Sequence, residues 1–199
     1  MPTYHSTALT LTFACFVASG VASGENPVFT TEPEQVRESG AGEGPVWHPK
    51  LGLLTSGDGN INRLDLNGKT SVFRNAAGSN GLLFDRSGRL IVCENRKRRV
   101  TRTNADGSIS ILAKSYKGSR FNQPNDLTID SQNRIYFSDP QYGDRSEREM
   151  RDANGKFVEG VYRIDPDGSV TRIITHEVDR PNGLIITPDD RYLFVADNN

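Results

Sequence analysis

Three asparagines recur at the same place in similar segments of the chain, and their amide oxygens could do chemistry. Asn80, Asn125 and Asn182 each precede Gly or Asp and a short apolar run. An asparagine in this context is commonly a turn residue whose side chain bonds the local backbone. Its amide oxygen is also a hard ligand of the kind that calcium accepts. Both interpretations stay open, and the choice between them depends on the secondary-structure elements that carry the asparagines.

The segments that carry the asparagines repeat along the chain at a spacing close to the length of a propeller blade. Asn80 and Asn125 are 45 residues apart, and Asn125 and Asn182 are 57 apart. Four short antiparallel strands in a unit of about 45 residues are typical of a propeller blade. The strands predicted for the second unit are Asn80–Phe84, Arg89–Glu94, Val100–Asn104 and Ser108–Ala113.

The whole pattern predicts an all-β fold, a β-propeller of which about three and a half blades are present. Blades are expected at about 43–75, 80–113, 124–174 and 182–199, within a partial propeller over 25–199. The third blade carries a charged insertion, Pro140–Glu159, expected as a surface loop over one mouth. A complete four-bladed propeller is the alternative, but the last unit supplies only two strands. Phe29–Glu38 could add one more.

Charge and apolar patterning exclude two classes of partner. The net charge is −1, and phosphate binding needs clustered positive charge, so we expect no nucleic acid; the one basic run, Arg96–Arg99, is expected at a solvated hairpin end. No apolar run reaches the ~18 residues of a bilayer span, so we expect no membrane span. Cys93 is predicted to be a small core residue on a strand.

The N-terminus has the features of a secretory signal peptide. Residues 8–22 are apolar or small and uncharged, and Gly20–Ala22 and Ala22–Gly24 both fit a small-x-small cleavage site. We therefore predict a signal peptide over 1–24 and a periplasmic or secreted location. A disordered leader is the alternative interpretation.

Several motifs together resemble the gluconolactonase, senescence marker protein and luciferin-regenerating enzyme-like family, and the exported bacterial gluconolactonases most closely. The resemblance implies a six-bladed propeller with one divalent ion, often calcium, in the central funnel, and hydrolysis of a small-molecule sugar lactone. The motifs are Glu43–Trp47 (EGPVW), Asn80–Asp85 (NGLLFD), Val92–Glu94 (VCE), Gln123–Asp126 (QPND), Tyr136–Gly143 (YFSDPQYG), Arg180–Gly183 (RPNG) and Val195–Asp197 (VAD).

The resemblance also implies roles for individual residues. Glu43 and Asn182 match metal ligands, and Asn125 matches a funnel asparagine that binds metal or substrate. An aspartate expected as a further ligand and base falls beyond Asn199, so the catalytic group is not identified. Gln123 stands where the animal members have an arginine that grips substrate. Asp167 is no replacement for the missing aspartate, because Pro166–Gly168 is expected as a hairpin turn.

A carboxylate and two amide oxygens would make a hard, oxygen-only site. Such a site suits calcium, or magnesium with water in the open positions, and lacks the His and Cys ligands that zinc and copper favour. The metal would polarise the lactone carbonyl for attack by water. Asn80 is as readily a turn residue as a ligand. Glu94 is expected to be a polar residue facing the channel, and Trp47 a core residue.

The alternative to a lactone hydrolase is a truncated, non-catalytic propeller remnant or a binding scaffold. It rests on the fourth unit, which ends after two predicted strands. The apolar strand Tyr192–Ala196 would then be an open sheet edge, which predicts self-association.

Overall fold

The computed structural model describes residues 42–198. The predicted signal peptide and Phe29–Glu38 lie outside the described residues, so the periplasmic or secreted location stays a prediction. Within the described part, no helix is long and apolar enough to span a membrane.

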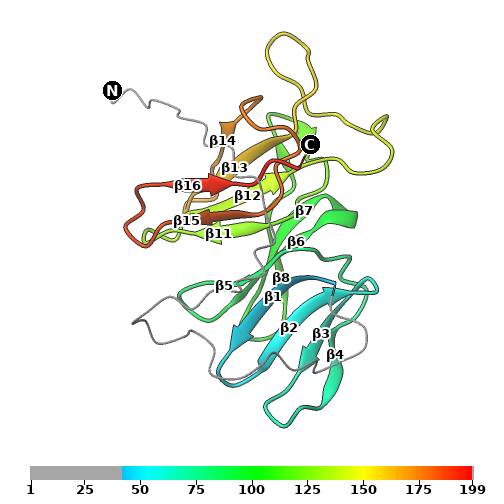
Figure 1. The fold of residues 1–199 in the computed structure, drawn as a ribbon, viewed down its shortest axis with the longest axis vertical. Coiled ribbons are helices and arrows are strands. Elements are labelled where there is room, and N and C mark those ends of the chain that lie inside the picture. The colour runs from blue at the N-terminus through cyan, green and yellow to red at the C-terminus, as the bar shows by residue number, and fades with distance from the viewer. Residues whose placement is uncertain (1–41, 199) are drawn as a thin grey trace, which may run out of the picture. The chain divides into compact units, whose positions relative to one another are not determined.

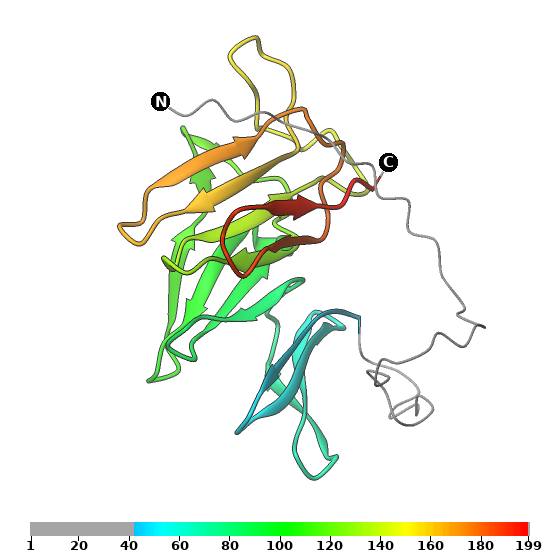
Figure 2. The same cartoon turned by 60° about the vertical axis from the view of Figure 1, so that its left-hand side comes forward.

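The described chain forms three complete four-stranded antiparallel sheets in succession (Figures 1 and 2). In each sheet the strands lie side by side in chain order. The first sheet comprises β1 (Glu43–His48), β2 (Gly52–Gly57), β3 (Asn60–Leu64) and β4 (Thr70–Arg74). The second comprises β5 (Leu82–Phe84), β6 (Leu90–Glu94), β7 (Arg99–Thr103) and β8 (Ile109–Ala113). The third comprises β11 (Leu127–Ile129), β12 (Ile135–Asp139), β13 (Gly160–Ile164) and β14 (Val170–Ile174).

Within residues 42–198, a fourth sheet contains two strands, β15 (Leu184–Ile186) and β16 (Leu193–Val195). The first strands of the successive sheets contact one another, β1 with β5, β5 with β11 and β11 with β15, as the inner strands of propeller blades do. The predicted all-β partial propeller is confirmed. Tyr192 and Phe194 are exposed, as expected for an open edge, and self-association through it stays a prediction.

Two short features were not predicted from the sequence. A ribbon of β9 (Ser115–Tyr116) and β10 (Ser119–Arg120) follows the second sheet, and a single 3₁₀ turn, η1 (Asn95–Lys97), joins β6 to β7. Strands of two residues are too short to show an alternating pattern.

The third strand of each complete blade carries the same irregularity. Its pairing with the fourth strand shifts register between Ile61 and Asn62, between Val100 and Thr101, and between Val161 and Tyr162. An extra residue at such a bulge bends the strand and increases its twist. The three blades therefore share one backbone geometry as well as one strand order.

The core consists of two apolar clusters, and the strand β6 supplies residues to both. Val92 and Leu90 belong to a cluster with Leu54 and Ile61 of the first blade. Ile91 and Cys93 belong to a cluster that includes Phe137, Tyr162 and Phe121 of the third blade and its approach. Successive side chains of a strand point to opposite faces. The second blade is thus buried on both sides, and the prediction that Cys93 is a core residue is confirmed.

Two side chains lie elsewhere than predicted. Glu94 does not face a channel: it is 1% exposed and accepts hydrogen bonds from Arg74 (2.7 Å), Arg99 (2.8 Å) and Thr101 (2.9 Å). Trp47 is 60% exposed rather than in the core. Its neighbour Val46 packs against the first cluster, and alternation along β1 turns Trp47 to the other face.

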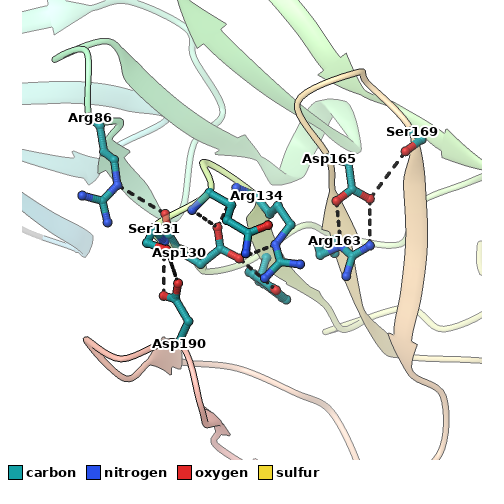
Figure 3. A network of polar contacts seen from close by, with 10 residues as sticks. Arg86, Asp130, Ser131, Arg134, Arg163, Asp165, Ser169 and Asp190 are labelled. Carbon is teal, nitrogen blue, oxygen red and sulfur yellow. Dashed lines mark hydrogen bonds and ion pairs between the residues drawn. The ribbon is translucent and has the colours of Figure 1, made fainter. Parts of the chain in front are cut away.

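A polar network joins the turns at the end of the inner strands away from the asparagines (Figure 3). Asp130 Oδ1 accepts the backbone N–H groups of Gln132 and Arg134 at 2.9 Å each, and its carbonyl accepts Arg86 Nε from the preceding blade at 3.4 Å. Ser131 bonds the Asp190 carboxylate of the following blade. These bonds fix neighbouring blades to each other at this end.

Asp139, at the end of β12, is fully buried, and only one of its two carboxylate oxygens accepts a hydrogen bond from a described residue. The backbone N–H of Asn122 donates to Oδ2 at 2.8 Å, whereas Oδ1 has no partner among the described residues. The Asn122 Oδ1 and the Tyr162 hydroxyl are also buried without partners there. Burial raises the pKa of Asp139 to about 8 against the opposing effect of the N–H donors and Arg98. The folded protein therefore holds this carboxyl group protonated at neutral pH.

We predict that Asp139→Asn flattens the dependence of stability on pH. The folded state keeps the Asp139 proton up to about pH 8, whereas the unfolded chain loses it near pH 3.8. The contribution of Asp139 to the free energy of unfolding is therefore greatest in acid. It falls as the pH rises from about 3.8 to about 8, by up to about 1.4 kcal/mol per pH unit. Asparagine keeps the acceptor and cannot titrate, so melting temperatures from pH 5 to 9 should decline less steeply.

Glu147→Gln, which changes an exposed carboxylate of the insertion, is the matched control and should follow the wild-type curve. An Asp139→Asn curve parallel to wild type would contradict the prediction.

Candidate functional site

The three recurring asparagines occupy equivalent backbone positions, just before the inner strands β5, β11 and β15. The backbone N–H of Asn80 donates to Cys93 (2.8 Å), that of Asn125 to Ser138 (2.9 Å) and that of Asn182 to Ala196 (3.0 Å). Each acceptor lies at the end of the second strand of its blade. The same two strands thus hold each asparagine at the same end of its blade.

Close backbone contacts bring these strand starts together across blades. The N–H of Gly81 donates to the carbonyl of Asn125 at 2.6 Å. A Cβ on Gly81 would lie 2.6 Å from that oxygen, and one on Gly44 would lie 2.4 Å from the Asn80 carbonyl oxygen. Only glycine fits these approaches. The residues that follow Glu43, Asn80 and Asn125 therefore form a continuous line of contacts at one mouth.

Three of the polar side chains at this mouth make no hydrogen bond to another described residue. They belong to Glu43, Asn80 and Asn125. Glu43 is exposed at the start of β1, whereas Asn125 is only 4% exposed. Side-chain groups that bond no protein group remain available to a water, an ion or a ligand.

Asn182 differs because one of its amide atoms is bound. Its Nδ2 donates to the Tyr142 hydroxyl at 2.8 Å, and Asn198 Nδ2 donates to the same hydroxyl at 3.0 Å. The backbone N–H of Tyr142 in turn donates to Gln123 Oε1 at 2.9 Å. Gln123, at the position of the expected substrate-gripping arginine, is therefore engaged with Tyr142. Sequence reasoning missed Tyr142, although it lies in the YFSDPQYG motif.

Asp126 was also missed. Its Oδ2 accepts the backbone N–H of Leu184 at 3.2 Å, so it joins the third blade to the fourth beside Asn125. Burial raises the pKa of the carboxyl group, against two backbone N–H donors. The equivalent residues in the second and fourth blades are Gly81 and Gly183, and this departure from the repeat was the available signal.

These groups fit a hard cation better than a soft one. Glu43, Asn125 and Asn182 offer one carboxylate and two amides, and Asn182 Oδ1 has no partner among the described residues. No group of three or more His, Cys, Asp or Glu side chains that could hold a metal occurs within residues 42–198. A metal at this mouth would therefore depend on amide oxygens, which calcium accepts. Asp167 lies in the β13–β14 turn, as predicted.

Comparison with known families gives a match over most of the chain. A family model described as "SMP-30/Gluconolactonase/LRE-like region" matches residues 41–199. That span includes every candidate residue discussed above.

Individual relatives point the same way. A gluconolactonase from Zymomonas mobilis subsp. mobilis is 34% identical over 125 residues, which cover 61% of this chain and 34% of the relative. The structure of a gluconolactonase from Xanthomonas campestris superposes with a TM-score of 0.70 at 33% identity, over 80% of this chain and 55% of that one. A calcium-binding regucalcin from Agrobacterium tumefaciens shares the fold, with a TM-score of 0.60 at 16% identity, over 81% of this chain and 52% of its own.

We predict that Gly81→Ala destabilises the protein, whereas Gly183→Ala does not. A Cβ at position 81 meets backbone atoms of Asn125 and Asp126 at 2.6 and 2.8 Å, while one at position 183 meets only the Asp126 carboxylate, at 3.7 Å. Overpacking of this kind costs about 1–3 kcal/mol, or roughly 2–12 °C in melting temperature for a chain of this size. Equal melting temperatures of the two variants, measured by calorimetry, would show that the close approach is unimportant.

Proposed function

Because the chain belongs to the SMP-30/Gluconolactonase/LRE-like family, we propose that it contributes the metal and substrate site of a sugar-lactone hydrolase. The observation that carries the proposal is the Asn125 amide, which bonds no other described side chain or backbone group at a mouth it shares with Glu43 and Asn182. The chain spans about a third of the Zymomonas gluconolactonase and just over half of the Xanthomonas one. Because the chain spans only part of these relatives, we propose lactone hydrolysis for it rather than infer it from theirs.

The proposed site holds a divalent cation, most readily calcium, through Glu43, Asn125 and Asn182. A cation bound there supplies Lewis acidity toward the lactone carbonyl and a lower pKa for a bound water. The site is oxygen-only and singly charged, which suits calcium or magnesium. The calcium-binding regucalcin with the same fold supports this choice of ion.

The proposed substrate contact is Asn125. Its amide can present Oδ1 to the cation and Nδ2 to an oxygen of the lactone, because the described residues use neither atom. Asn80 offers a second free amide at the equivalent place in the neighbouring blade. Sugar lactones carry several hydroxyl groups, and amides both donate to and accept from such groups. We assign no general base within residues 42–198.

We predict that Glu43→Gln lowers calcium affinity at least about 10-fold, because it removes the only carboxylate of the proposed site. Calcium titration by calorimetry measures the affinity. A pH-stat assay with glucono-1,5-lactone, with and without chelator, measures hydrolysis above the spontaneous rate. Chelation should abolish that excess rate, and added calcium should restore it.

Asp167→Asn is the matched control, because it removes a carboxylate from the β13–β14 turn and should change neither measurement. Calcium binding that is equally strong in Glu43→Gln, or equally reduced in Asp167→Asn, would overturn the assignment of the site.

A further inference from the structure

The Tyr142 hydroxyl is the only described partner of the Asn182 amide. We propose that Tyr142 is a positioning residue that turns the Asn182 amide oxygen toward the cation, an inference that rests on the proposed function. Tyr142 comes from the insertion of the third blade, whereas Asn182 lies just before the inner strand β15 of the fourth. The insertion would therefore complete the site rather than merely cover it.

Amide geometry gives the first step. The oxygen and nitrogen of an asparagine side chain diverge by about 120° from one planar carbon, so fixing one atom fixes the other. The Tyr142 hydroxyl accepts hydrogen bonds from Asn182 Nδ2 at 2.8 Å and from Asn198 Nδ2 at 3.0 Å, so it acts as an acceptor toward both amides. Oδ1 then points away from Tyr142, and no other described residue uses it. Without the hydroxyl, the terminal torsion of the amide is broad, and either atom can face the mouth.

The second step is that Tyr142 is itself held from two sides. Its backbone N–H donates to Gln123 Oε1 at 2.9 Å. The preceding residue, Gln141, donates its backbone N–H to Glu159 Oε2 at 3.2 Å and its side-chain amide to the Asp144 carbonyl at 2.8 Å. A group orients another only when its own position is restrained, and these bonds fix the backbone from which the Tyr142 side chain projects.

The third step links two proposed ligands. Gln123 lies two residues before Asn125 in the same segment. The bonds from Gln123 to Tyr142 and from Tyr142 to Asn182 therefore connect the segment of one amide ligand to the side chain of the other. Loss of such outer groups generally costs 10–100-fold in metal affinity.

The test is calcium titration by calorimetry of the full chain and three variants: Tyr142→Phe, Asn182→Asp and the double variant. Tyr142→Phe should weaken calcium binding about 10–100-fold, with a fall in melting temperature of no more than about 3 °C. An aspartate at position 182 presents an oxygen in either orientation. In the Asn182→Asp background, Tyr142→Phe should therefore change the affinity less than about 3-fold.

Tyr192→Phe, which removes the hydroxyl of an exposed tyrosine near β16, is the matched control and should change neither affinity nor melting temperature. Wild-type affinity in Tyr142→Phe would overturn the positioning role and leave the proposed function standing. An equal loss in both backgrounds would also overturn it, because Tyr142 would then act without orienting an amide. Absence of calcium binding in the wild-type chain would overturn the site itself.

Discussion

The structure depends on how closely the inner strands of neighbouring blades approach each other. A backbone hydrogen bond of 2.6 Å runs from the Gly81 N–H to the Asn125 carbonyl, and it exists only because position 81 has no Cβ. Gly44 plays the same part between the first and second blades. These approaches hold the strand starts at one mouth, so residues far apart in the sequence become neighbours there. The opposite ends are fixed differently, by side-chain bonds between turns such as Ser131 with Asp190.

The mouth combines polar groups that are satisfied with polar groups that are not. Asp126 accepts a hydrogen bond from the backbone N–H of Leu184 in the next blade. The Tyr142 hydroxyl accepts one from the Asn182 side chain, also in the next blade. The side chain of Asn125 bonds no described residue, so its amide is available to a ligand. Rigid neighbours around an unsatisfied amide are the arrangement that a preorganised binding site requires.

Buried charge is handled in two different ways in the same core. Glu94 is ion-paired, since Arg74 and Arg99 donate to its carboxylate and the Thr101 hydroxyl also donates to it. Asp139 has N–H donors on one oxygen only, and burial raises its pKa to about 8, so it is held neutral. Both residues end the second strand of their blade. The difference lies in whether a cation reaches the carboxylate at hydrogen-bond distance.

The sequence by itself determined the blade pattern, because alternating apolar runs and glycine turns act locally and repeat. It also predicted that Asn80, Asn125 and Asn182 are equivalent. It could not predict that Trp47 is exposed or that Glu94 is ion-paired, because both depend on which face of a strand meets a neighbouring blade. It could not reveal the bond between Tyr142 and Asn182 either. These residues lie 40 positions apart, in different blades, and only the packing of one blade on the next brings them within hydrogen-bond distance.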